Sequence, residues 1–315
     1  MLIKDSVNLT KAVKSIGIKG RIIEGEDLKK HTTLKIGGEA KYFIVPFDGE
    51  DIAKIINFAN DNQVPYVILG GGSKILFPDL IFKGIVINLN NHFFKKIILD
   101  KEYVKIDAGV KINELLGWML RNRLGDWEFL AGIPGTLGGA VRLNAGVRDL
   151  TEANNYLQIG DFVKEVTVLD KNGKLLRLDK KDLKFDYRES NLSNFVILQV
   201  ILTKGEKKDI SHIKKRINNF LNYRKKTQDL KSPSAGCVFK NPGNNKSSGE
   251  LIELSGLKGK RIGDVAVSKK HANFFINLGK ATAKDFLTLM EYVQRKVNYD
   301  HGVWLNPEIH IIRNL

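Results

Sequence analysis

The sequence has a single cysteine, Cys237, among 315 residues. One thiol can form neither an internal disulfide nor a thiolate metal cluster, so no disulfide scaffold and no metal site are expected. No stretch approaches the roughly 18 consecutive apolar residues of a membrane-spanning helix. The first twenty residues also lack the apolar core of a secretion signal. We therefore expect a cytoplasmic chain that does not insert into membranes.

Acidic residues are scarce as well, with 35 Asp and Glu against 51 Lys and Arg, a formal net charge of +16. Such an excess suits polyanionic partners, either nucleic acid or phosphorylated cofactors and substrates. The lysines are scattered, whereas nucleic-acid-binding proteins gather basic residues into a stripe or tail. A basic nucleotide-binding or nucleic-acid-binding protein stays open as an alternative on charge alone.

The chain shows no internal repeat and no low-complexity tract, and 43% of its residues are hydrophobic, which is enough for packed cores. Helical and strand patterns alternate throughout, which predicts an α+β protein. Helices are predicted at 51–62, 110–124, 210–226, 248–257 and 281–298. Strands are predicted within 64–73 and at 84–89, 103–109, 163–170, 173–178, 195–202, 273–277 and 308–314. Breaks near 85–90 and 204–208 predict three units, 1–88, 89–205 and 206–300.

The sequence has two glycine-rich segments, LGGGSKILF at 69–77, directly after an apolar strand, and EFLAGIPGTLGGAVRLNAG at 128–146. Consecutive glycines let backbone N–H groups converge into an anion-binding nest. The first segment lacks the glycine and lysine order of a Walker A loop and the G-x-G-x-x-G of a Rossmann fold, and by itself it is equally typical of a tight turn. The second is longer than a turn requires and predicts backbone lying close to a flat or bulky cofactor.

With further motifs, these segments resemble the UDP-N-acetylenolpyruvoylglucosamine reductase family. The motifs occur in the family's order over most of the chain: HTTLKIGGEA (31–40), LGGGSKILF (69–77), EFLAGIPGTLGGAVRLNAG (128–146), FDYRESN (185–191), PSAGCVFKNP (233–242), GLKGKRIGDVAVSKKHANFFIN (256–277) and LNPEIHII (305–312). The resemblance implies a two-part FAD-binding domain of the vanillyl-alcohol-oxidase-like type and a C-terminal α+β substrate domain. The short span from Arg188 to Phe239 resembles the family members that lack a substrate-covering loop. The terminal strand, within 301–315, would pack back near the flavin site.

The family's reaction implies non-covalent FAD, NADPH as hydride donor and UDP-N-acetylglucosamine enolpyruvate as substrate, in a monomeric enzyme of peptidoglycan precursor synthesis. By resemblance, the residues that would contact FAD are Gly70, Gly71, Gly72, Ser73, Gly132, Ile133, Gly135, Thr136, Gly139 and Ala140. Those that would contact the sugar nucleotide are Tyr187, Arg224, Lys225, Lys240 and Asn241. Weaker candidates for the substrate-domain face are Lys258, Arg261, His271 and Asn273.

Three residues match the family's catalytic positions. Arg188 offers a planar fork of donors to the substrate carboxylate, where negative charge develops during the reduction. Glu308, if burial kept it neutral, would hydrogen-bond the developing enolate. Cys237 occupies the position of the proton donor, which is a serine in the family's reference pattern. A free thiol, with a pKa near 8.5, is a far stronger acid than an alkyl hydroxyl.

Two rival interpretations remain open. Another FAD-dependent oxidoreductase of the same fold would explain the first 205 residues but not PSAGCVFKNP or Glu308. A nucleic-acid-binding protein would leave the glycine-rich segment 128–146 unexplained.

Overall fold

The computed structural model describes residues 6–152, 155–243 and 246–314. The chain divides into two compact units, each built from several segments. Unit 1 comprises the described residues up to Glu24, then Lys41–Gly71 and Lys83–Leu221, and unit 2 comprises Gly25–Ala40, Gly72–Phe82 and the described residues from Asn222 onward. The three-part division expected from the sequence stays a prediction.

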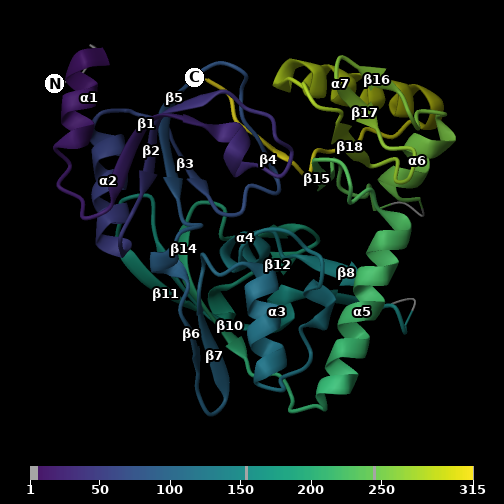
Figure 1. The fold of residues 1–315 in the computed structure, drawn as a ribbon, viewed down its shortest axis with the longest axis horizontal. Helices are drawn as coiled ribbons and strands as arrows, with labels where there is room; N and C mark the ends of the chain where they lie inside the picture. Colours follow the sequence, from purple (N-terminus) through teal and green to yellow (C-terminus); the bar gives the residue numbers. More distant parts are fainter. Residues whose placement is uncertain (1–5, 153–154, 244–245, 315) are drawn as a thin grey trace. The chain divides into compact units, whose positions relative to one another are not determined.

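Unit 1 contains most of a four-stranded sheet in the order β1 (Arg21–Asp27), β2 (Glu39–Val45), β5 (Phe82–Asn88) and β3 (Tyr66–Leu69). Strands β3 and β5 run parallel, and Figure 1 shows α1 (Ser6–Lys14) and α2 (Gly49–Asp61) beside this sheet. Helix α2 begins where Asp48 accepts a hydrogen bond from the Asp51 amide, and its isoleucines Ile52, Ile55 and Ile56 are fully buried. The helix therefore forms because its apolar spacing matches the sheet it covers.

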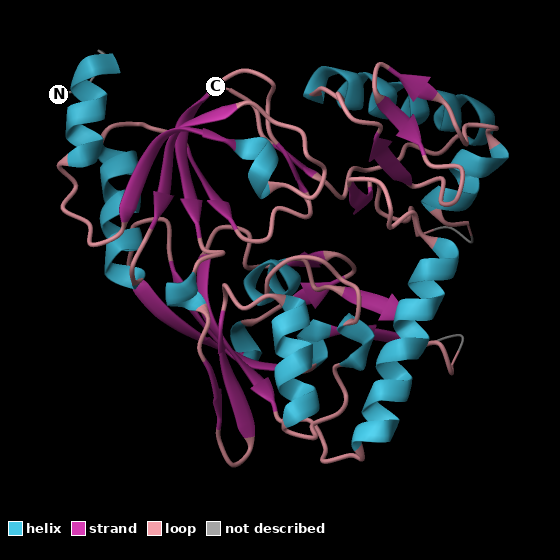
Figure 2. Cartoon of the chain, viewed as in Figure 1, coloured by secondary structure: helices cyan, strands magenta, loops and turns pink. Residues whose placement is uncertain are grey.

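A second sheet of unit 1 is antiparallel, in the order β11 (Leu175–Asp179), β10 (Val163–Leu169), β14 (Val196–Thr203), β7 (Tyr103–Asp107) and β6 (Ile97–Leu99). Its core also contains buried side chains of α3 (Ile112–Arg121), α4 (Leu137–Arg142) and α5 (Ile210–Thr227). Two short hairpins complete it, β8 (Gly146–Arg148) with β9 (Tyr156–Gln158) and β12 (Phe185–Asp186) with β13 (Glu189–Ser190). The β-rich character of unit 1 is visible in Figure 2.

Unit 2 has a four-stranded sheet in the order β15 (Ser234–Cys237), β18 (Phe274–Asn277), β17 (Val265–Val267) and β16 (Arg261–Ile262). It shares a core with α6 (Ser248–Leu254) and α7 (Ala283–His301). Helix α7 begins in a capping box of Thr282 and Asp285 and ends at Gly302, whose φ of 67° is left-handed. The short terminal strand β19 (His310–Ile311) pairs in parallel with β4 (Ile75–Leu76).

Most elements predicted from periodicity are confirmed, with shifts of a few residues at their ends. The strand of the cysteine motif is β15 at Ser234–Cys237, and just after it Phe239 forms an isolated bridge with Pro307. The segment 128–146 is also more than a cofactor loop, since it contains helix α4. Short 3₁₀ turns within the described part lie at Leu28–His31, His92–Phe94, Glu128–Leu130, Ile159–Asp161 and Lys180–Asp182. Among the described residues, no helix combines the length and the apolar character needed to cross a bilayer.

Candidate functional site

The two glycine-rich segments lie directly against each other in unit 1. A Cβ atom added at Gly71 would lie 2.4 Å from the Cα of Gly135, and one added at Gly70 would lie 2.5 Å from Oγ1 of Thr136. Real side chains do not approach this closely, so both positions require glycine. The tertiary structure therefore brings together predicted FAD-contacting residues that are far apart in the sequence.

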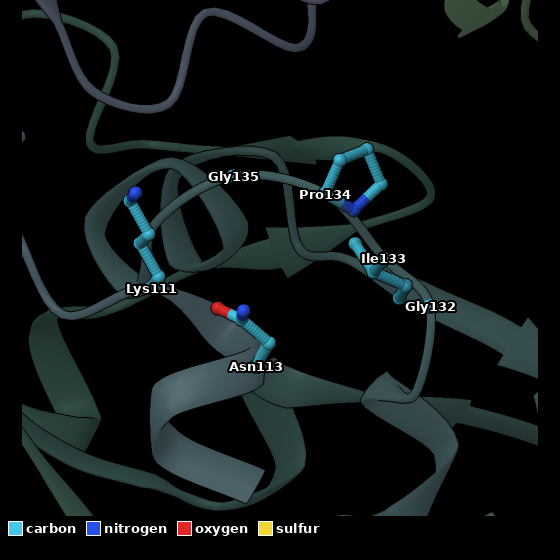
Figure 3. A pocket seen from close by; sticks show the side chains of 6 residues that line it. All are labelled: Lys111, Asn113, Gly132, Ile133, Pro134 and Gly135. Atoms are coloured by element: carbon cyan, nitrogen blue, oxygen red, sulfur yellow. The ribbon is translucent and has the colours of Figure 1, made fainter. Parts of the chain in front are cut away.

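A pocket of about 340 Å³ opens beside this contact. Figure 3 shows its lining, in which Lys111 and Asn113 come from the start of α3 and the loop before α4 supplies the rest, Gly132, Ile133, Pro134 and Gly135. Gly132 and Gly135 have φ values of 76° and 115°, which place this loop in a conformation that favours glycine. The lysine and the helix N-terminus favour an anionic group. Sequence reasoning missed Lys111 and Asn113, although their place at a predicted helix start was the available signal.

The other predicted FAD residues divide between exposed and buried positions. In α4 and its cap, Thr136 and Ala140 are buried, whereas Gly139 is exposed. Gly138 has a structural reason of its own, since a Cβ there would lie 2.8 Å from the Cβ of Ala108. Gly72 belongs to unit 2, where a Cβ would lie 1.9 Å from the carbonyl oxygen of His31. The bare backbone at Gly70, Gly71, Gly132 and Gly135 fits a cofactor that carries a pyrophosphate.

Arg188 lies in the two-residue turn between β12 and β13, after Tyr187. Its φ of 57° is left-handed, which is uncommon for a residue with a long side chain. Its guanidinium carbon lies 5.3 Å from the ring centre of Tyr187 and 5.7 Å from that of Tyr156. These distances suit cation–π interactions with both rings. A buried amide supports the turn, because Asn144 donates from Nδ2 to the carbonyl oxygen of Asp186 over 2.9 Å.

Cys237 and Glu308 lie on adjacent segments of unit 2. The amide of Glu308 donates to the carbonyl oxygen of Val238 over 2.7 Å, and the amide of Lys240 donates to the carbonyl oxygen of Asn306 over 2.8 Å. Cys237 is half-buried at the end of β15, and the Glu308 side chain is only 6% exposed. These backbone bonds hold the two predicted catalytic residues close together.

Lys74 joins this pair and was missed by sequence reasoning, although it stands inside the first glycine-rich motif. Its Nζ lies 2.6 Å from Oε1 of Glu308 and donates to the carbonyl oxygen of Cys237 over 2.7 Å. An ion pair with an ammonium group offsets the cost of burying a carboxylate, so Lys74 gives Glu308 a partner that the sequence did not indicate. The side chain that holds Glu308 is thus supplied by a segment distant in sequence.

The small residues before Cys237 have structural reasons of their own. Gly236 has a left-handed φ of 70°, a conformation that favours glycine. A Cβ there would be in ordinary contact with Nζ of Lys74, at 3.5 Å. Ala235 is buried in the unit 2 core.

The predicted substrate residues of unit 2 do not form one group of free side chains. Asn241 accepts a hydrogen bond at Oδ1 from the amide of Ser248 over 3.1 Å, so its carbonyl oxygen holds the start of α6. Lys240 is fixed through its backbone, since Ser248 donates from Oγ to its carbonyl oxygen over 2.5 Å. Arg224 and Lys225 lie in the last turn of α5, where Lys225 is exposed.

The weaker candidates of the substrate-domain face have distinct surroundings. Burial lowers the pKa of His271, and the positive charges of Lys258 and Arg224 act in the same direction. Arg261 pairs with Asp264. Asn273 is 2% exposed and clamps the segment after Cys237, because its Oδ1 accepts from the amide of Phe239 over 2.9 Å and its Nδ2 donates to the Phe239 carbonyl oxygen over 2.8 Å.

We call the close-packed glycines of unit 1 the glycine cradle: Gly70, Gly71, Gly132 and Gly135. This cradle and the order of the elements define an FAD-binding α+β flavoprotein, and comparison with known proteins agrees. The family model described as "FAD binding domain" matches residues 40–179, and the one described as "UDP-N-acetylenolpyruvoylglucosamine reductase, C-terminal domain" matches residues 228–312. The predicted fold class, a two-part FAD-binding domain with a C-terminal α+β domain, is confirmed.

Relatives named UDP-N-acetylenolpyruvoylglucosamine reductase extend the match to almost the whole chain. The one from Clostridium novyi is 37% identical over 98% of this chain and 97% of its own length, and the one from Desulforamulus reducens is 38% identical over 94% and 95%. The crystal structure of the reductase from Thermus caldophilus matches with a TM-score of 0.74 and 30% identity, over 94% of this chain and 100% of that one. The chain belongs to the UDP-N-acetylenolpyruvoylglucosamine reductase family, and the predicted family, enzyme class and FAD cofactor are confirmed.

Proposed function

We propose that the chain reduces the enolpyruvyl ether of UDP-N-acetylglucosamine enolpyruvate to the lactyl ether of UDP-N-acetylmuramate, in peptidoglycan precursor synthesis. FAD, when bound, relays hydride from NADPH to one carbon of the alkene. The residues that would hold it are the glycines of the unit 1 cradle together with Lys111 and Asn113. Family membership and the FAD-binding domain support this assignment.

Cys237 supplies the proton. The thiol gives its proton to the alkene carbon next to the one that receives hydride, so the ether is saturated and a thiolate remains. Proton uptake from solvent restores the thiol, and the half-buried position of Cys237 is compatible with that exchange. A free thiol, with an ordinary pKa near 8.5, is a stronger acid than an alkyl hydroxyl and can donate this proton directly.

Arg188 and Glu308 stabilise and orient the negatively charged enolate that develops beside the protonated carbon. The Arg188 guanidinium, fixed by Tyr156 and Tyr187, offers paired donors to the substrate carboxylate as its negative charge grows. Glu308 acts as a carboxylate whose charge Lys74 balances, so it can orient the enolate without adding net negative charge. Tyr187, Arg224, Lys225, Lys240 and Asn241 are proposed to bind the sugar nucleotide.

The observation that carries the proposal is the adjacency of Cys237 and Glu308, which pairs a proton donor with a charged carboxylate in one unit. The proposal is tested under anaerobic conditions by measuring two half-reactions separately, reduction of the flavin by NADPH and its reoxidation by the substrate. The purified protein should be yellow, NADPH should bleach its flavin absorbance, and UDP-N-acetylglucosamine enolpyruvate should restore it. Protein that takes up no FAD, or reduced protein that this substrate does not reoxidise, would refute the reductase assignment.

The thiol's role is tested by two substitutions of Cys237. We expect Cys237→Ala to keep its rate of flavin reduction by NADPH, whereas reoxidation by the substrate falls by roughly 10²–10⁴-fold because the proton donor is gone. Cys237→Ser should retain substantial reoxidation, because a hydroxyl occupies the same position. Normal turnover in Cys237→Ala would show that the proton comes from another group.

A further inference from the structure

Lys74 is a largely buried cation whose backbone is fixed by tertiary structure. It precedes β4, and the amide of His310 donates to its carbonyl oxygen over 2.8 Å. The parallel pairing of β4 with β19 continues from this bond. Only 24% of its side chain is exposed. A lysine this buried is uncommon unless its charge is paired.

The Lys74 ammonium bridges two groups that matter for the proposed reaction. It contacts the Glu308 carboxylate at 2.6 Å and the Cys237 carbonyl oxygen at 2.7 Å. Glu308, at 6% exposed, has little water to solvate its charge. A buried carboxylate without a partner is strongly unfavourable, so the ion pair with Lys74 helps to hold the Glu308 side chain in place.

The chain around Cys237 is held at two points. Lys74 donates to the carbonyl oxygen of Cys237 itself. Two residues further on, Asn273 hydrogen-bonds the backbone of Phe239. Lys74 and Asn273 therefore anchor the segment at the thiol residue and just after it.

We propose that Lys74 is a positioning residue, which ties the Glu308 carboxylate to the backbone of Cys237 and so holds the carboxylate and the thiol in a fixed relation. It acts through these two residues and does not itself transfer the proton. This inference rests on the proposed reductase function for its kinetic consequence, while its structural consequence, the fixed position of Cys237, stands independently.

The kinetic test compares Lys74→Met with Lys74→Arg in the FAD-loaded protein. Lys74→Met keeps the length and apolar stem but removes the charge, so we expect flavin reduction by NADPH within about twofold of wild type. Reoxidation at saturating substrate should fall by about tenfold to 100-fold, the range expected when reacting groups are displaced by about 1 Å. Lys74→Arg should recover part of the loss, because its guanidinium can still pair with Glu308. Unchanged reoxidation in Lys74→Met would overturn the proposal.

A double-mutant cycle distinguishes positioning of Glu308 from a general loss of packing. We expect Lys74→Met combined with Glu308→Gln to reoxidise no more slowly than the worse single variant, because residues that act as a unit are not additive. Multiplicative losses would show that Lys74 acts apart from Glu308 and would contradict the proposal. The matched control is Lys83→Met, since Lys83 is exposed on β5, and both half-reactions should be unchanged in it.

A second measurement needs no enzymatic activity, because Cys237 is the only thiol in the chain. Its maximal alkylation rate by iodoacetamide at high pH, where the thiol is fully ionised, reports how well the segment is held. We expect this rate to rise several-fold in Lys74→Met and to stay unchanged in Lys83→Met. If Lys74→Met is insoluble, Lys74→Gln takes its place in both tests. An unaltered alkylation rate would refute the anchoring of Cys237, and a wild type that no substrate reoxidises would instead refute only the reductase function.

Discussion

The cations Arg188 of unit 1 and Lys74 of unit 2 are held in opposite ways. Arg188 stands in a two-residue turn, and its charge faces the rings of Tyr156 and Tyr187. Lys74 stands beside a strand, and its charge meets a carboxylate and a carbonyl oxygen. Arg188 therefore makes cation–π contacts with two rings, whereas Lys74 is part of an ion pair.

The difference teaches what each cation is suited to do. Aromatic faces orient a guanidinium without cancelling its charge, so Arg188 is suited to meet the negative charge of a substrate. Holding it there also costs roughly 1–2 kcal/mol, because its left-handed φ is unfavourable for a residue with a side chain. In the ion pair, the positive charge of Lys74 is already balanced by Glu308. Lys74 is therefore suited to holding other residues in place.

The largest effect is expected when Arg188 is substituted. Arg188→Ala should slow reoxidation of the reduced flavin by the substrate by about 10²–10³-fold, the usual effect of removing a donor from developing charge. Arg188→Lys should remain close to the alanine variant, because an ammonium group lacks the planar fork. Stopped-flow absorbance measures both rates.

The matched control for this test is Lys74→Arg. We expect it to be reoxidised faster than Lys74→Met, because at position 74 the positive charge matters more than the shape of the group that carries it. Full activity in Arg188→Lys would show that the two cations do not differ in this way.

The next effect concerns the glycine cradle, which has its closest approach in unit 1. Gly71→Ala should lower the free energy of unfolding by about 1–3 kcal/mol and reduce the FAD content, because its Cβ would meet Gly135. Urea unfolding and the flavin absorbance of the purified protein measure the two effects. Gly117→Ala is the control: in helix α3 its Cβ has room, and alanine there should add roughly 0.5–1 kcal/mol. Equal stability and FAD content in Gly71→Ala and wild type would argue against a close-packed cradle.

The smallest effect is a pH dependence in unit 2, at His271. Burial lowers the pKa of His271 in the folded state, whereas in the unfolded chain it keeps its ordinary value of about 6.5. The unfolded state therefore binds the proton first as pH falls. The contribution of His271 to stability is present above about pH 6.5 and is lost as pH falls toward the lower, folded-state pKa.

We accordingly expect His271→Gln to reduce the loss of stability between about pH 7.5 and pH 5.5 by no more than about 1 kcal/mol. Urea unfolding midpoints of wild type and variant at the two pH values measure it. A wild-type slope that the substitution leaves unaltered would assign the dependence to other groups.

Much of the fold could be predicted because its signals are local. Helix α5 was predicted at 210–226 and lies at Ile210–Thr227, since its apolar spacing and polar borders are properties of consecutive residues. The strand β15 was not predicted, because strand assignment depends on the partner. Cys237 finds Phe274 in a ladder, whereas Phe239 finds Pro307, and no local pattern distinguishes these two partners.

The residues of the candidate site also fall into two groups, those that local motifs indicate and those that only tertiary contacts reveal. The motifs named Cys237, Arg188 and Glu308 directly, but Lys74, Lys111 and Asn113 were missed. Lys74 stood in the first motif as one lysine among many on a basic chain, and its significance depends on a buried carboxylate far along the sequence. Lys111 and Asn113 lie at the start of α3, and only the folded loop at Gly132–Gly135 places them in a pocket.

By itself, the sequence determined the α+β class, the family, the glycines that a close backbone approach requires and the identity of the thiol at position 237. These properties depend on residue type and on spacing along the chain, so they can be inferred without knowing which residues are in contact. Only the tertiary structure decided that Gly71 lies against Gly135 and that Glu308 forms an ion pair with Lys74. It also decided that Lys74 contacts the backbone of Cys237. The physical reason is that burial and ion pairing depend on distances between segments remote in sequence, and folding alone sets those distances.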